Sequence, residues 1–301
     1  MSGSRAGLKL GGLALVIAVV FGAAYGIGQL VGPVTSEPAA AEHDGMAAEE
    51  SHGDAGHDAA GVPKGLQITQ DGTTLEVLST GLSAGQPADF TFRILGRDGS
   101  AAMTFARTHD KLMHLIVARR DLSGFQHVHP TMAADGTWRV PLTFAGAGDY
   151  RVFADFQLAG AADGLTLGAD VPVTGAYTPA ELPKPALTSA VDDYRVTLSG
   201  KLTPGTTSKL TLTVDKASVP VTDLQPYLAA YGHLVALRQG DLAYLHVHPD
   251  GEPGRTKAGP NIVFYAEVPS AGTYRLYLDF KHGDVVRTAE FTVVAGEHGH
   301  E

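Results

Sequence analysis

The chain contains the same segment twice, and this internal repeat constrains the fold more than any other feature. The stretch MHLIVARRDLSGFQHVHP (113–130) aligns without a gap with GHLVALRQGDLAYLHVHP (232–249). Further on, AGDYRVFADF (147–156) aligns with AGTYRLYLDF (271–280). Such self-similarity indicates a structural unit that occurs more than once. We therefore predict two tandem domains, residues 64–177 and 183–296, with a linker at 178–182.

Each repeat has the pattern of an all-β domain. Short runs rich in Val, Leu, Thr, Tyr and Phe, such as TLEVLS, YRVFADF and YRLYLDF, alternate with Gly-, Pro- and Asp-containing turns. About seven such strands in about 110 residues, without helical periodicity, predict an immunoglobulin-like β-sandwich. Tyr150 and Tyr274 follow a Gly-x step and are expected to pack at a corner of each sandwich.

The N-terminal segment has the pattern of a membrane anchor. Arg5 and Lys9 flank a strongly apolar stretch at 10–31, which is long enough to cross a bilayer as a helix. Residues 1–9 would then stay in the cytoplasm, and the repeats would lie outside the cytoplasmic membrane. A cleaved signal peptide is the alternative, with Ala39 to Ala41 as the cleavage region and a secreted product, although its apolar region is usually only about 7–15 residues.

Two further segments carry histidines outside the repeats. Residues 32–63 read as a disordered linker that contains His43, His52 and His57, and the tail at 297–301 contains His298 and His300. Both segments are either loose metal binders or solvated spacers.

Composition excludes several classes of function. The chain has no cysteine, so disulfides, thiolate catalysis and zinc–sulfur sites are excluded. Its net charge of −10 argues against a nucleic-acid partner, which would require a basic surface.

The repeated segment carries three histidines at a constant spacing, His-x12-His-x-His-Pro. We expect a β-hairpin in which the first histidine lies opposite the second and diagonal to the third. Three imidazoles on one face would suit copper or zinc. A structural hydrogen-bonded network is the alternative, and catalysis is less favoured. The candidate metal ligands are His114, His127 and His129 in the first repeat and His233, His246 and His248 in the second.

Other residues near this pattern are weaker candidates for the metal site. Asp155 and Asp279 match between the repeats, and either could orient a ligating imidazole, but we favour a structural role for both. His109 occurs only in the first repeat and could add a ligand from the preceding loop.

The second repeat also fits a competing motif, the first cupin signature. The matching positions are Gly240, His246, His248, Glu252 and Gly259, and the motif would make Glu252 a ligand in a metalloenzyme. The first repeat has Asp121 in place of Gly240, has no counterpart of Glu252, and no second cupin motif follows. The signature is therefore a minor alternative.

The module MHLIVARRDLSGFQHVHP…GDYRVFADF resembles a repeated unit of bacterial exported, heavy-metal-associated proteins, and is similar in style to the CopC and YtkA types of copper-handling sandwiches. CopC-type proteins use a histidine at the mature N-terminus, which has no assigned counterpart here. The resemblance implies an exported, membrane-anchored protein that binds or buffers copper or zinc, with another exported or membrane metal-handling protein as a partner. An extracellular interaction module with structural histidines is the alternative, and an enzyme is the weaker class.

Overall fold

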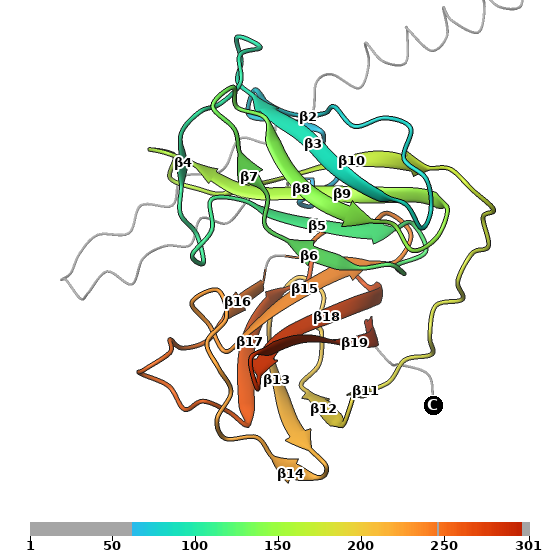
Figure 1. Cartoon of the computed structure of the whole chain (residues 1–301). Coiled ribbons are helices and arrows are strands. Elements are labelled where there is room, and N and C mark those ends of the chain that lie inside the picture. The colour runs from blue at the N-terminus through green and yellow to red at the C-terminus, as the bar shows by residue number, and fades with distance from the viewer. Residues whose placement is uncertain (1–61, 246, 297–301) are drawn as a thin grey trace, which may run out of the picture. The chain divides into compact units, whose positions relative to one another are not determined.

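The structure is a computed structural model that describes residues 62–245 and 247–296. Every regular element of this described part is a β-strand, so the prediction of all-β structure for the repeats is confirmed (Figure 1). Among the described residues, no helix is long and apolar enough to cross a membrane. The predicted anchor at 10–31 and the histidines of the linker and the tail lie outside the described residues.

The first repeat consists of two antiparallel sheets. One sheet has the strand order β1-β2-β3-β8-β7, and the other has the order β10-β9-β5-β6 with β4 paired to β9. The strands are β1 (Thr69–Gln70), β2 (Thr73–Val77), β3 (Pro87–Leu95), β4 (Phe105–Ala106), β5 (His114–Arg119), β6 (Gln126–Val128), β7 (Thr131–Met132), β8 (Trp138–Thr143), β9 (Gly148–Leu158) and β10 (Leu165–Val173).

The second repeat has the same plan. One sheet has the order β11-β12-β13-β17-β16 with β14 paired to β13, and the other has the order β15-β18-β19. The strands are β11 (Thr188–Val191), β12 (Tyr194–Ser199), β13 (Thr207–Lys216), β14 (Val219–Pro220), β15 (Gly232–Arg238), β16 (Val247–Pro249), β17 (Asn261–Glu267), β18 (Gly272–His282) and β19 (Val285–Ala295). Two tandem sandwiches are therefore present, as predicted.

Each sandwich buries its own apolar core between its two sheets. In β8, the residues from Trp138 to Thr143 alternate between buried and exposed, which is the pattern of a strand with one face in the core. The predicted corner tyrosines donate their hydroxyl hydrogens to carbonyl oxygens four residues upstream. The distance is 3.0 Å from Tyr150 to Gly146 and 2.8 Å from Tyr274 to Ser270.

Strands β5 and β15 are buried on both faces. In β5, Leu115 and Val117 belong to the core of the first sandwich, whereas Ile116 and Ala118 belong to a separate apolar cluster shared by both repeats. This cluster, here called the inter-repeat core, consists of Ile116, Ala118, Leu122, Phe153, Val235, Leu237, Leu242 and Tyr277. The outer face of each β5- or β15-containing sheet is therefore covered by the other repeat.

The contacts across the inter-repeat core are reciprocal. Phe125 stacks on Tyr277 with ring centroids 3.9 Å apart, and Phe153 packs on Tyr244 at 5.7 Å. In the repeat alignment Phe125 corresponds to Tyr244, and Phe153 corresponds to Tyr277. The same two surface positions therefore meet each other twice, as in the interface of a two-fold homodimer.

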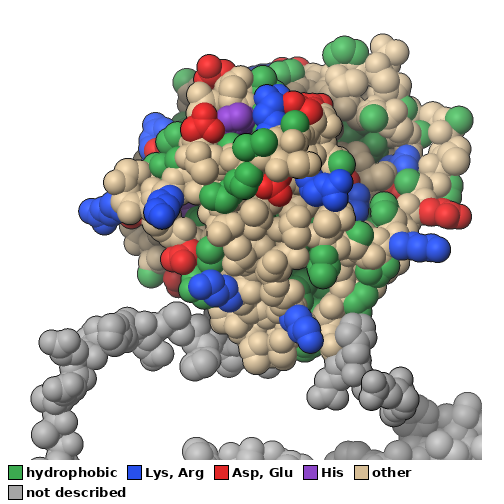
Figure 2. Space-filling view, turned by 90° about the horizontal axis from the view of Figure 1, so that it is seen from below, with side chains coloured by type: hydrophobic (Ala, Val, Ile, Leu, Met, Phe, Trp, Pro, Cys, Tyr) green, Lys and Arg blue, Asp and Glu red, His purple; other side chains and the backbone are tan. Residues whose placement is uncertain are grey.

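The outer surface has a different character from these buried faces. In the view of Figure 2, Lys, Arg, Asp and Glu side chains are interspersed, and hydrophobic side chains are scattered among polar atoms. Scattered surface hydrophobic residues are ordinary for a folded domain. The repeated histidines of the first repeat lie instead on the buried outer face of the β5 sheet.

Candidate metal centre

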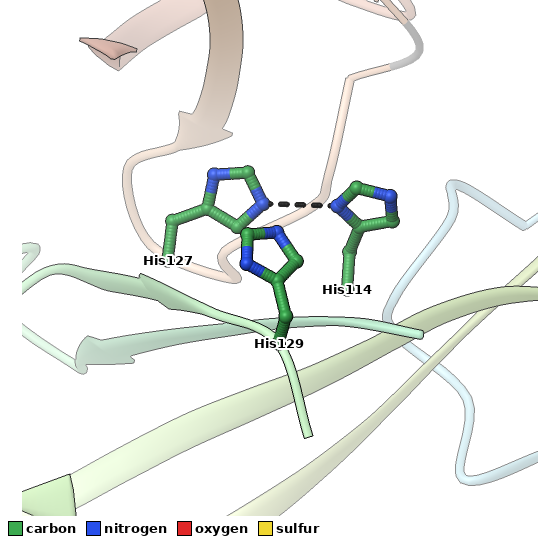
Figure 3. A group of neighbouring side chains, drawn as sticks. All are labelled: His114, His127 and His129. Carbon is green, nitrogen blue, oxygen red and sulfur yellow. Dashed lines mark hydrogen bonds between the residues drawn. The ribbon is translucent and has the colours of Figure 1, made fainter. Parts of the chain in front are cut away.

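Three histidines of the first repeat come together at the edge of the inter-repeat core. His114 begins β5, His127 lies in β6 and His129 follows it, and their side chains leave the same face of the strand pair. One ring nitrogen of each lies within 4.8 Å of the other two. Figure 3 shows the three imidazoles turned toward one another. We call this group the histidine triad.

The hydrogen bonds of the triad determine where the ring protons lie. His114 Nε2 lies 3.1 Å from the carbonyl oxygen of Thr108, and His127 Nδ1 lies 2.8 Å from the carboxylate of Asp279. A carbonyl and an ionised carboxylate only accept hydrogen bonds, so both of these nitrogens carry hydrogen. The remaining nitrogens, His114 Nδ1 and His127 Nε2, then both present lone pairs, and they face each other at 3.1 Å.

Two lone pairs at this distance repel each other unless a cation lies between them. A proton shared by the two rings is one solution, and a metal ion is the other. Two nitrogens bound to one ion at 2.0–2.1 Å, with an angle of about 90–110° between the bonds, lie about 2.9–3.4 Å apart. The observed separation of 3.1 Å fits this arrangement.

His129 supplies a third nitrogen. Its Nε2 is buried and has no hydrogen-bond partner among the described residues. A buried nitrogen without a partner is costly, and a bound ion would satisfy it. The His129 ring centroid lies 5.0 Å from that of His114 and 4.9 Å from that of His127, so all three rings surround one point.

The electrostatics favour neutral rings. Burial, together with the neighbouring His127 and His129, lowers the pKa of His114 to about 3, although the hydrogen bond to Thr108 acts in the opposite direction. Burial likewise lowers the pKa of His129 to about 3. These two imidazoles are therefore neutral at pH 7, which is the form that binds metal.

The second repeat contributes two residues to this centre. Asp279 in β18 provides the carboxylate that holds His127, and its side chain is buried. His233 in β15 lies with its ring centroid 6.1 Å from that of His127 and 6.4 Å from that of His114. Its Nε2 lies 3.1 Å from the Tyr227 carbonyl oxygen, which repeats the contact of His114 with Thr108.

Of the remaining candidate ligands, His109 lies beside the triad, with its ring centroid 6.0 Å from that of His114 and 5.3 Å from that of His233. The others are not placed at the triad. His248 is exposed in β16, where it pairs with Tyr265 of β17. His246 lies outside the described residues. Glu252, the carboxylate of the cupin signature, is an exposed surface residue that pairs with Arg255 at 3.1 Å. Within the described part of the chain, only the first triad forms a group of three close ligands.

The hairpin of the first repeat is present, but its register differs from the prediction. Ile116 pairs with His127 and Leu115 pairs with Val128, so His127 is diagonal to His114 rather than opposite it. In the second repeat, β16 pairs with β17 of the other sheet. Among the described residues, the two arms of the hairpin are joined by the isolated bridge between Leu237 and Tyr244 and by the hydrogen bond from Leu245 N–H to the Ala236 carbonyl oxygen at 2.9 Å.

Sequence reasoning did not identify the inter-repeat position of the centre. One signal was available in the apolar runs HLIVA and HLVAL, which do not alternate with polar residues. A strand with this pattern is buried on both faces, so another surface must cover the face that carries the histidines.

One family model matches the chain twice. It is described as a domain of unknown function, DUF8832, and it matches residues 68–173 and residues 189–297. The two matches cover most of the chain, which therefore belongs to this family. No curated protein matches the chain.

Solved structures similar to this chain include bacterial surface proteins and titin. The Escherichia coli adhesin FdeC is 19% identical with a TM-score of 0.24, over 76% of this chain and 65% of FdeC. The bacterial integrin-binding protein invasin is 15% identical with a TM-score of 0.21, over 73% of this chain and 39% of invasin. A chimeric titin tandem is 12% identical with a TM-score of 0.19, over 74% of this chain and 97% of the titin chain. Likeness at this level carries no argument about function.

Proposed function

We propose that this member of the DUF8832 family binds a transition metal ion, copper or zinc, through His114, His127 and His129. The observation that carries the proposal is the pair of facing lone pairs on His114 Nδ1 and His127 Nε2, together with the partnerless buried Nε2 of His129. Imidazole ligands without thiolates suit Zn(II) or Cu(II).

The setting of the site is part of the same proposal. The apolar segment at 10–31 and its positive flank support an exported chain anchored in the cytoplasmic membrane, and the lack of cysteine suits an oxidising compartment. The corner tyrosines support an immunoglobulin-like class for both sandwiches. In this setting the protein would buffer the metal or pass it to another exported metal-handling protein.

The test is a calorimetric titration of the full chain with Cu²⁺ and Zn²⁺. We expect one tight equivalent, which a variant with His114→Gln, His127→Gln and His129→Gln loses. The matched control carries His43→Gln, His52→Gln and His57→Gln in the linker, which removes the same number of imidazoles. The control should keep the tight equivalent, and metal should raise its melting temperature but not that of the triad variant.

The titration also has an outcome that would contradict the proposal. If wild type and triad variant bind the same weak equivalents, the histidines form a structural network, and the surface-interaction alternative takes the place of metal binding.

A further inference from the structure

A cavity between the repeats adjoins the histidine triad. It has a volume of about 60 Å³, and its lining includes His114, His127 and Asp155 from the first repeat and His233 and Tyr244 from the second. A water molecule requires about 10–15 Å³ of such space and two to four polar partners. The cavity therefore has both the room and the polar groups to hold a small ligand beside the triad.

A metal ion on three protein ligands has an unfilled coordination position. Structural zinc sites fill it with a fourth protein ligand, whereas sites that exchange a ligand leave it to water. His233 is the nearby imidazole of the second repeat that would close the site. His109 also lines the cavity, and its ring centroid lies 6.0 Å from that of His114. The distances of these two rings from the triad therefore decide between the two arrangements.

Ring separations place His233 outside the first coordination sphere. Imidazoles that share a tetrahedral ion at 2.0–2.1 Å have ring centroids about 5.2 Å apart. The triad rings lie 4.9, 5.0 and 5.4 Å from one another, in agreement with this value. His233 lies 6.1 Å from His127 and 6.4 Å from His114, which leaves space for an intervening small molecule.

We infer that a metal ion bound by the triad carries an exchangeable water in this cavity. A small inorganic anion can replace this water, so the fourth coordination position takes an exogenous ligand and is not filled by a protein side chain. The inference rests on the metal site proposed above. His233 Nε2 is held by the carbonyl oxygens of Tyr227 and Leu228, at 3.1 and 3.0 Å. Its Nδ1 therefore presents a lone pair, which accepts a hydrogen from the metal-bound water.

The experiment uses the full chain loaded with one equivalent of Cu²⁺. Pulsed electron paramagnetic resonance in ¹⁷O-labelled water counts the coordinated imidazole nitrogens and detects a coordinated water. We expect three nitrogens and one exchangeable water, which added azide displaces. Four nitrogens without ¹⁷O coupling would overturn the inference while leaving metal binding intact. Failure to hold one tight copper would overturn the proposed function, and this inference with it.

A His233→Ala variant tests the role given to that ring. We expect three coordinated nitrogens as before, because His233 is not a ligand. Azide has no hydrogen to donate, so in wild type its binding displaces the water and loses the hydrogen bond between water and His233. The variant should therefore bind azide about threefold to tenfold more tightly.

The matched control is His282→Ala, which removes a partly buried histidine that contacts Tyr194 and Asp223. It should leave azide binding unchanged. Loss of a coordinated nitrogen in His233→Ala would identify His233 as a direct ligand and overturn the inference.

Discussion

Asp279 controls the histidine triad without being one of its members. Its Oδ2 accepts a hydrogen bond from His127 Nδ1 at 2.8 Å, and its Oδ1 accepts one from the Thr288 hydroxyl at 2.6 Å. Because both oxygens are engaged, the carboxylate is fixed in orientation. It therefore sets which nitrogen of His127 carries hydrogen, and carboxylates commonly orient metal-ligating histidines in this way.

Replacing Asp279 should weaken metal binding. In Asp279→Asn the side-chain NH₂ group can face His127 Nδ1, which favours the tautomer with hydrogen on Nε2 and removes a ligand lone pair. We expect metal affinity to fall about 10- to 100-fold, measured by competition with a chelator. The control is Asp223→Asn, which changes the carboxylate of another His–Asp contact, with His282 at 3.1 Å. Equal losses in both variants would contradict the assigned role.

The buried histidines should also make the metal-free protein sensitive to acid. Burial lowers the pKa of His114 and His129 to about 3 and that of His233 to about 4. The unfolded chain therefore binds more protons below pH 6.5, and stability falls as the pH drops from 6.5 toward 4. Each histidine contributes up to about 2 kcal/mol of this loss between pH 7 and pH 5.

Urea unfolding at pH 7 and pH 5 with a chelator present measures this loss. Burial raises the pKa of Asp155, which acts in the opposite direction, but one carboxyl group is outweighed by three imidazoles. A His114→Gln variant should show a smaller difference between the two pH values. Equal stability of wild type at both values would contradict the prediction.

At the scale of single elements, β5 and β15 behave like interior strands although each lies in a sandwich of only two sheets. Leu115 points into the core of the first sandwich and Ile116 into the inter-repeat core, yet their exposures are 0% and 1%. The strand that carries His114 is therefore held from both sides, which restricts the ring positions at the site.

Truncation on either face of β5 should cost a similar amount of stability. We expect Ile116→Ala to lower the free energy of unfolding by about 2–4 kcal/mol, as for a core residue, because it leaves a cavity. Arg139→Ala in β8 is the control, since that side chain is about half exposed, and it should cost less than about 0.5 kcal/mol. Equilibrium urea unfolding would measure both. A cost for Ile116→Ala near that of the control would show that the outer face is not buried.

Strand composition and period predicted the strands and the shared face of the triad, because both depend on local alternation. Strand composition and period did not predict the register of the β5–β6 hairpin. Ile116 rather than His114 pairs with His127, because the hairpin is centred between Asp121 and Leu122, one residue later than the predicted pairing requires. The contact of Asp279 with His127 depends on which residues of the two repeats face each other, whereas the apolar runs HLIVA and HLVAL indicate only that the histidine-bearing face is covered.

At the scale of the whole molecule, the described repeats form one interacting pair. The Tyr277 hydroxyl donates to the Leu122 carbonyl oxygen at 2.5 Å, and its ring stacks on Phe125. The His127–Asp279 contact crosses the same interface. Metal affinity and the docking of the repeats are therefore expected to depend on each other.

A double-mutant cycle tests this docking in solution. Phe125→Ala and Tyr277→Ala should show a coupling energy of about 0.5–1.5 kcal/mol in unfolding experiments. The pair Phe125→Ala and Tyr194→Ala is the control and should be additive, because Tyr194 packs on Phe280 in the core of the second sandwich. Zero coupling for the first pair would mean that the repeats do not dock as described.

The reciprocal contacts have a consequence for how such a chain can vary. In a homodimer every substitution enters both halves of the interface at once. Here the two halves belong to one polypeptide, so each can change alone, and Leu228 stands where the first repeat has His109. Covalent fusion thus permits the first half to supply the imidazoles of the proposed site while the second supplies the Asp279 carboxylate that holds His127, a division of labour that two identical subunits could adopt only by duplicating it.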